Sequence, residues 1–285
     1  MDRGDDGGRA AGQGGAAAPW QAAVFRIGLL PFQAVAATSR PVEESVLTAI
    51  LQDAWRQYRR RPLAVVLTVG FGLVQVPLTL AGETVQLLVA VPMLVVNLLL
   101  ELFLIVYLAG ALGSGPAAAA GSLAAARRSL LPGVRAFLLK AVYAVPAFLI
   151  GILLLGPRDT GPLPVSEQAK FFVGLAPLFA FAWAFLAVLP QRVVLDNERR
   201  VLRGATVAHR VAAAHFPICL VIALVDAISL MTAGLPTGLA GLAAIILVLS
   251  LLEPFRIAMG NALFLRTRAL HVVEPKARSG DQNRW

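Results

Sequence analysis

Charged residues are scarce in this chain. Asp, Glu, Lys and Arg make up 14% of the 285 residues, while hydrophobic residues make up 58%. Soluble domains carry about 25% charged and about 45–50% apolar residues, so these values argue against a water-soluble domain. The mean hydropathy is +0.75, and several apolar runs reach the length of about 20 residues that crosses a bilayer as a helix. The composition therefore predicts an all-α integral membrane protein.

Residues that commonly carry chemistry are also few. Cys219 is the only cysteine, which excludes intrachain disulfides and cysteine-rich metal sites. His209 and His215 are six residues apart and face apart on a helix, unlike a metal-binding HExxH pair, so we expect them at the surface. Neither GxxxxGK[ST] nor GxGxxG occurs in a strand-turn-helix setting, and no Ser, His and acid arrangement stands out. We therefore expect no enzymatic activity, no metal and no cofactor.

The positive charge is distributed unevenly along the chain. The formal net charge is +9, from 25 Lys and Arg against 16 Asp and Glu. A nucleic-acid-binding protein would need a basic face on a soluble module. Here, only Arg158 and Lys170 fall in the loops that we place outside the membrane. This positive-inside pattern predicts a multi-pass protein of the cytoplasmic (inner) membrane with both termini in the cytoplasm, and no nucleic-acid partner.

Both ends of the chain are poor in large apolar side chains. Residues 1–18 lack the apolar core of a signal peptide, so we expect a disordered cytoplasmic tail and insertion driven by internal helices. Residues 269–285 are interpreted as a second cytoplasmic tail. Residues 19–38 are apolar but contain Arg26 and Pro31, so they either lie at the membrane interface or insert partly.

Residues 39–268 form the predicted membrane domain. Its first segment, 41–61, carries apolar residues at helical i, i+4 spacing and is expected to lie flat on the membrane. Six spans follow it. The external turns between the first two spans and between the last two are so short that each pair must be an antiparallel hairpin. The predicted spans are 62–82, 84–112, 133–156, 170–190, 212–234 and 237–265.

Prolines at the start of the odd-numbered spans indicate an internal repeat. AWRQYRRRP, AAARRSLLP and HRVAAAHFP end at Pro62, Pro132 and Pro217, and each is a basic amphipathic segment that runs into an apolar span. We interpret them as three copies of one unit, an interfacial amphipathic helix followed by two spans, related by pseudo-symmetry. Chance similarity among Ala- and Leu-rich segments is the alternative. The repeat boundaries are about 41–113, 117–195 and 197–268.

Two stretches of the sequence resemble a known membrane domain. They read LPQRVVLDNERRVLRGATVAHRVAAAHFP and AWRQYRRRPLAVV, and they are similar to the membrane domain of bacterial glycerophosphoryl diester phosphodiesterases and of related uncharacterised six-helix membrane proteins. The resemblance covers about residues 43–268 and implies a fold and a topology more than an activity, because many such proteins lack the catalytic domain. This chain also lacks a segment that could form that domain's metal-binding barrel. The family's enzymatic residues therefore carry over to no position.

Polar groups inside predicted spans are candidate functional residues, because an unpaired ionisable group in lipid is costly. Asn97 and Glu101 lie one turn apart on the second span. Glu101 is either a proton or cation site or an interhelical clamp, and the same two interpretations apply to Asp226 in the fifth span. Glu253 and Arg256 are i, i+3 neighbours near the cytoplasmic end of the sixth span, where a local ion pair is a sufficient explanation.

Basic and aromatic residues of the interfacial segments are expected to contact anionic lipid headgroups. We expect a non-enzymatic scaffold, regulator or assembly partner that acts in the membrane with lipids, with another membrane protein or as a homo-oligomer. The alternatives are a transporter or permease subunit with a polar path along Asn97, Glu101 and Asp226, and an intramembrane enzyme acting on lipids. The expected headgroup contacts are Trp55, Arg56, Arg59, Arg60, Arg61, Arg127, Arg128, Arg199 and Arg200.

Overall fold

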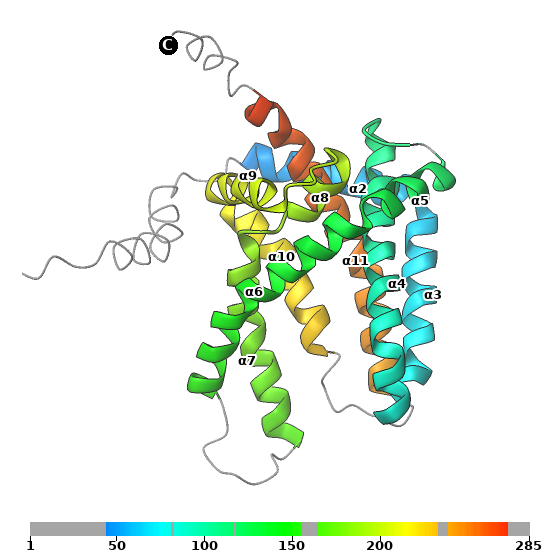
Figure 1. Ribbon diagram of the computed structural model, residues 1–285, viewed down its shortest axis with the longest axis vertical. Helices are drawn as coiled ribbons and strands as arrows, with labels where there is room; N and C mark the ends of the chain where they lie inside the picture. The colour runs from blue at the N-terminus through cyan, green and yellow to red at the C-terminus, as the bar shows by residue number, and fades with distance from the viewer. Residues whose placement is uncertain (1–43, 81–82, 117, 156–164, 233–238, 273–285) are drawn as a thin grey trace, which may run out of the picture. The chain divides into compact units, whose positions relative to one another are not determined.

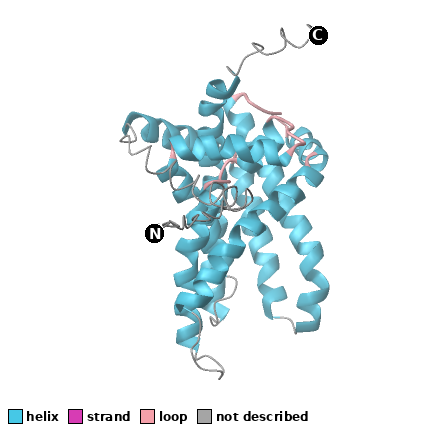
Figure 2. Cartoon of the chain, turned by 60° about the vertical axis from the view of Figure 1, so that its left-hand side comes forward, coloured by secondary structure: helices cyan, strands magenta, loops and turns pink. Residues whose placement is uncertain are grey.

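Helices and turns make up the described part of the chain. The computed structural model describes residues 44–80, 83–116, 118–155, 165–232 and 239–272, and no strand occurs among them (Figure 2). The all-α fold class is confirmed. The predictions for the tail at 1–18, for the segment at 19–38 and for most of the external loop between the predicted spans 133–156 and 170–190 lie outside the described residues, as does the second tail beyond residue 272.

Short helices gather at one end of the long apolar ones. In Figure 1, α2, α5, α8 and α9 lie at the upper end, and α3, α4, α6, α7, α10 and α11 run down from it. The elements in chain order are α2 (Glu44–Arg60), α3 (Pro62–Leu80), α4 (Glu83–Ala109), the 3-10 turn η1 (Gly110–Leu112), α5 (Ala119–Arg128), α6 (Leu130–Leu155), α7 (Val165–Ala184), α8 (Leu189–Leu195), α9 (Val201–Ala214), α10 (Phe216–Thr232) and α11 (Leu239–Val272).

Several described helices are apolar enough to span a membrane. Leu88–Leu112, Leu130–Leu154 and Ala244–Arg268 meet the length and composition of a span without a break. Two bent pairs meet it together, α7 with α8 at 45° and α9 with α10 at 116°, and the first part of α3 is a shorter apolar helix. The described residues thus hold three to five candidate spans, against six in the sequence prediction.

Prolines explain where several helices begin. Pro62 is the first residue of α3, Pro190 the second of α8 and Pro217 the second of α10. Proline fits the first turn because its missing N–H has no intrahelical acceptor there. The predicted span at 212–234 therefore starts too early, since α9 continues to Ala214 and the chain turns at His215. The predicted span at 170–190 is likewise interrupted, because α7 ends at Ala184 and α8 starts only at Leu189.

The apolar side of α2 faces the protein as well as its surroundings. Ile50 and Ala54 are fully buried, and α2 packs mainly on α11. Leu47 and Leu51 are each 40% exposed, and Trp55 is 52% exposed. Part of the apolar side of α2 is therefore used to dock the helix on the bundle, and the orientation of the helix flat on the membrane stays a prediction.

The long helices pack in two groups. α6 and α10 each pack on α7, while α3 and α4 each pack on α11. In the second group, Thr68 Oγ1 of α3 donates to Ser250 O of α11 at 2.7 Å. A Cβ on Gly72 would lie 2.5 Å from Ser250 Oγ, so glycine permits the close approach of α3 and α11 at this level.

Candidate functional site

A single arginine, Arg256 of α11, lies at the centre of a charged cluster. Its side chain is 2% exposed, and its guanidinium faces three carboxylates. Nη1 lies 2.9 Å from Asp226 Oδ1 on α10, and Nη2 donates to Glu101 Oε1 on α4 at 3.1 Å. Glu253, one turn earlier on α11, accepts from Nε at 2.9 Å and also from Nη2. These two bonds form the bidentate fork that suits a planar guanidinium.

Lys140 extends the cluster to α6. Its Nζ donates to Asp226 Oδ2 at 2.7 Å, so each oxygen of Asp226 faces a different cation. The same Nζ lies 5.3 Å from the ring centroid of Trp183 on α7, a cation–π contact. Trp183 Nε1 also donates to Lys140 O at 2.9 Å. We call the five residues Glu101, Lys140, Asp226, Glu253 and Arg256 the ionic cluster.

The ionic cluster joins the two groups of long helices. The pair of Arg256 with Asp226 connects α11 to α10, and the pair of Asp226 with Lys140 connects α10 to α6. The exposed fractions of the cluster side chains run from 2% to 28%. Charges so poorly exposed are costly unless they are paired, so separating the two groups of helices would uncover charges that now compensate one another.

The structure brings together only some of the residues singled out from sequence. Glu101 and Asp226 both contact Arg256, whereas the Asn97 side chain is exposed on α4 and makes no hydrogen bond within the described part of the chain. The local pair of Glu253 with Arg256 is present, but Arg256 also reaches α4 and α10. Lys140 escapes sequence reasoning, although a lone lysine inside an apolar run is a signal that could have found it.

Two buried amides form a second polar contact, between α2 and α11. Gln57 and Asn261 are both 0% exposed. Gln57 Nε2 donates to Ala258 O at 3.0 Å, and Asn261 Nδ2 donates to Gln57 Oε1 at 3.1 Å and to Ile105 O of α4 at 2.9 Å. Buried polar groups cost free energy unless they are bonded, so this amide pair fixes the position of α2 against α4 and α11.

His209 is half buried, and the protein holds both of its ring nitrogens. Its Nδ1 faces Ala205 O at 2.7 Å, its Nε2 faces the Tyr143 hydroxyl at 3.0 Å, and its ring stacks on Phe185. Because a carbonyl only accepts, Nδ1 is the donor in the contact with Ala205 O. His215, at the break before α10, is half buried, and this burial lowers the pKa of its imidazole.

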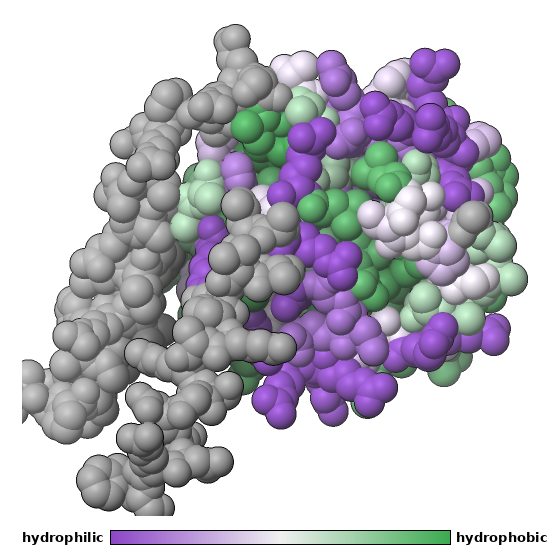
Figure 3. Space-filling model, turned by 90° about the horizontal axis from the view of Figure 1, so that it is seen from above, coloured by the Kyte–Doolittle hydropathy of each residue, from purple (hydrophilic) through white to green (hydrophobic). Residues whose placement is uncertain are grey.

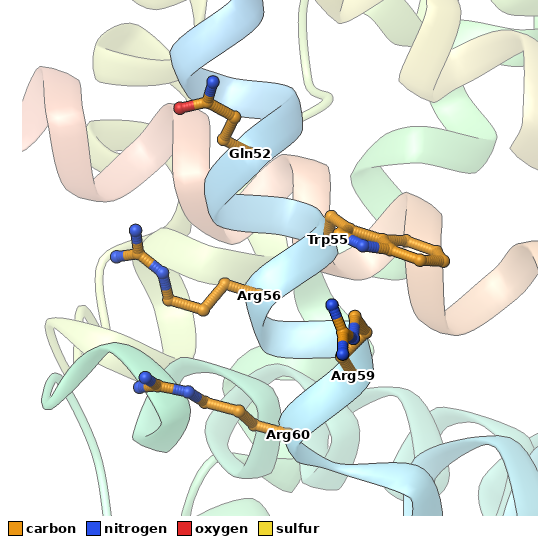
Figure 4. A pocket seen from close by; sticks show the side chains of 5 residues that line it. All are labelled: Gln52, Trp55, Arg56, Arg59 and Arg60. Carbon is orange, nitrogen blue, oxygen red and sulfur yellow. The ribbon is translucent and has the colours of Figure 1, made fainter.

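A surface hollow of about 440 Å³ lies along α2. Its described lining is Gln52, Trp55, Arg56, Arg59 and Arg60. Figure 4 shows Gln52, Arg56 and Arg60 on the left of the helix, and Trp55 and Arg59 on its right. These two sets are each spaced by four residues, which places each set in one row along a helix.

The predicted headgroup contacts differ in how exposed their side chains are. Arg61 is half buried, and its guanidinium lies 4.7 Å from the ring centroid of Tyr107, so it is held by the protein. The other predicted contacts are exposed: Trp55, Arg56, Arg59, Arg60, Arg127, Arg128, Arg199 and Arg200.

Comparison of the chain with protein-family models, with curated proteins and with solved structures gives no match.

Proposed function

We propose that this chain is a non-enzymatic, multi-pass protein of the cytoplasmic membrane that acts as a scaffold, regulator or assembly partner and holds anionic lipid at its cytoplasmic side. The observation that carries the proposal is the set of exposed arginines on the short helices α2 and α5 and before α9, which lie at one end of the long helices (Figure 1). Seen from above, hydrophilic side chains cover much of that end, with hydrophobic ones among them (Figure 3). Arginines beside apolar residues suit an anionic headgroup layer.

We assign six spans to α3, α4, α6, α7, α10 and α11. α3 and α10 are the shortest of these six helices, with 19 and 17 residues. Both values lie within the range of about 17–25 residues that a spanning helix needs. In this topology the N-terminus and the C-terminus are cytoplasmic, as the positive-inside pattern predicts.

A three-fold repeat of surface helix, span and span is part of the proposal. Its support is the recurrence of one join, in which a single residue separates α2, α5 or α9 from the apolar helix that follows it. That residue is Arg61 between α2 and α3, Ser129 between α5 and α6, and His215 between α9 and α10. The resemblance to the membrane domain of glycerophosphoryl diester phosphodiesterases belongs to the same proposal and concerns fold and topology only.

Thermal unfolding of the detergent-purified chain tests the lipid part of the proposal. We expect added phosphatidylglycerol to raise the unfolding temperature more than added phosphatidylcholine, because a ligand that binds only the folded state stabilises it. The difference should shrink at 0.5 M salt, where exposed charges are screened within about 3–5 Å. Equal stabilisation by both lipids at low salt would contradict a preference for anionic headgroups.

A transporter is the second candidate function, favoured by the ionic cluster. With every group ionised, the cluster has three carboxylates against two cations, and Glu101 and Glu253 remain 21% and 28% exposed. An excess negative charge there suits a proton or a small cation. A proton or cation flux into proteoliposomes would favour transport if Glu101→Gln abolished it. The scaffold proposal predicts that the proteoliposomes show the same flux as liposomes without protein.

A further inference from the structure

The arginines of the hollow on α2 have few carboxylate partners among the residues that the structure describes. Arg56 Nη1 lies 3.6 Å from Asp53 Oδ1, but Asp53 is already bonded by Arg266 at 2.6 and 2.9 Å. Within the described part of the chain, Arg60 donates only to a backbone carbonyl, Ala111 O, at 3.4 Å. Arg59 has no carboxylate partner among the described residues. Counted over the described residues, three guanidiniums within two turns thus share part of one carboxylate, so the described lining of the hollow carries excess positive charge.

An apolar row runs along α2 into the hollow. Leu47, Leu51, Trp55 and Arg59 are spaced by four residues, so they line up on one side of the helix. The first three are 40%, 40% and 52% exposed. Trp55 is held in place by stacking on Tyr58, with ring centroids 5.7 Å apart and planes 12° apart. An apolar row that ends at arginines matches a molecule with an apolar part and an anionic head.

We propose that the hollow on α2 binds one anionic phospholipid, whose phosphate is held by Arg56, Arg59 and Arg60 while Leu47, Leu51 and Trp55 contact its glycerol and acyl part. This inference rests on the proposed function and adds a defined site to it. Guanidiniums bind phosphate oxygens with forked hydrogen bonds, and the Gln52 amide supplies a further donor. The apolar row selects a lipid rather than a soluble phosphate, because free phosphate has nothing to place there.

The position of Trp55 gives a local readout of occupancy. The full chain is reconstituted in phosphatidylcholine nanodiscs that contain increasing fractions of acyl-brominated phosphatidylglycerol, and the parallel arm uses acyl-brominated phosphatidylcholine. The fluorescence difference between the parent chain and Trp55→Phe isolates the Trp55 signal from the other three tryptophans. We expect the quenching of Trp55 to saturate at a much lower fraction of brominated phosphatidylglycerol than of brominated phosphatidylcholine. Inorganic phosphate at 5 mM should leave the quenching by phosphatidylglycerol unchanged.

Matched variants separate a defined site from diffuse attraction. Each arginine near an anionic surface contributes about 1 kcal/mol, so Arg56→Gln with Arg59→Gln should raise the half-quenching fraction roughly 25-fold. Arg127→Gln with Arg128→Gln removes the same charge from exposed positions on α5, outside the hollow, and should raise the half-quenching fraction far less than the α2 variant does. If the double variant on α2 does not fold, Arg59→Gln alone serves instead, because the Arg59 side chain contacts no described carboxylate. This single variant should raise the half-quenching fraction about fivefold.

Each other outcome overturns a distinct statement. Equal effects of the α2 and α5 variants would overturn the defined site and leave the general preference for anionic lipid. Displacement of the brominated lipid by 5 mM inorganic phosphate would overturn the lipid as the occupant. Equal quenching by the two brominated lipids in the parent chain would overturn both this inference and the proposed lipid function.

Discussion

Replacing Arg256 by methionine is expected to lower the unfolding temperature of the detergent-purified chain by at least about 6 °C. The variant leaves Glu101, Asp226 and Glu253 without their shared guanidinium, and removing one partner of a buried ion pair costs about 3–5 kcal/mol. For a domain of this size, about 1 kcal/mol shifts the unfolding temperature by roughly 2–4 °C.

Two further variants make the Arg256 result specific. Arg266→Met removes an arginine that is 44% exposed and pairs with Asp53, so it should cost no more than about 1 kcal/mol. Adding Glu101→Gln and Glu253→Gln to Arg256→Met should recover part of the loss, because fewer unpaired charges remain. An Arg256→Met protein that unfolds at the same temperature as Arg266→Met would contradict the ionic cluster as a clamp.

Replacing Asn261 by leucine is expected to destabilise the chain by about 2–3 kcal/mol. The Asn261 amide donates to Ile105 O and to Gln57 Oε1. Because Gln57 is fully buried, its Oε1 would be left without a partner, and water could not replace the lost bond. Because these bonds hold α2, the loss should also speed cleavage by trypsin after Arg59 and Arg60. Unfolding temperature and cleavage rate are measured on the same detergent-purified sample.

The controls for Asn261 use the same change at other positions. Asn97→Leu alters an exposed amide on α4 and should change the stability by no more than about 0.5 kcal/mol. Gln57→Leu combined with Asn261→Leu replaces both partners by apolar groups and should be more stable than Asn261→Leu alone. A cleavage rate at α2 that is unaffected by Asn261→Leu would mean that the amide pair does not hold this helix.

Local sequence signals predict the helices of this chain well. A proline costs a helix no hydrogen bond only in its first turn. Pro62 and Pro217, each at the end of a basic amphipathic segment, therefore mark helix starts in the sequence and in the structure. The amphipathic segment at 41–61 likewise forms α2. These signals act between residues close in sequence, so no knowledge of the packing is needed to use them.

Partners distant in sequence are harder to predict. Glu101 and Asp226 stand out because each is an acid in an apolar run, but their common partner Arg256 lies 155 residues from Glu101. Near Arg256 the sequence offers Glu253, which is sufficient for a local pair and hides the contacts to α4 and α10. The partner of a charge on a helix depends on which helices pack together, and spacing along one helix carries no such information.

Buried polar side chains on surface helices are missed for a related reason. Gln57 lies between Arg56 and Tyr58 in a segment whose apolar periodicity suggests one membrane-facing side. Its burial follows from the docking of α2 on α11 and from the acceptor offered by Ala258 O. Amphipathicity predicts that one side of a helix is covered, but it does not predict whether lipid or protein covers it.

Cysteine labelling of the intact cell tests the central claim, that the long helices cross a membrane with the basic short helices on the cytoplasmic side. In a Cys219→Ser background, one variant carries Ala124→Cys on α5 and another Asp159→Cys in the predicted external loop. A membrane-impermeant maleimide should label the cysteine at 159 in intact cells and the cysteine at 124 only after permeabilisation. Labelling at 124 in intact cells without labelling at 159 would contradict the account.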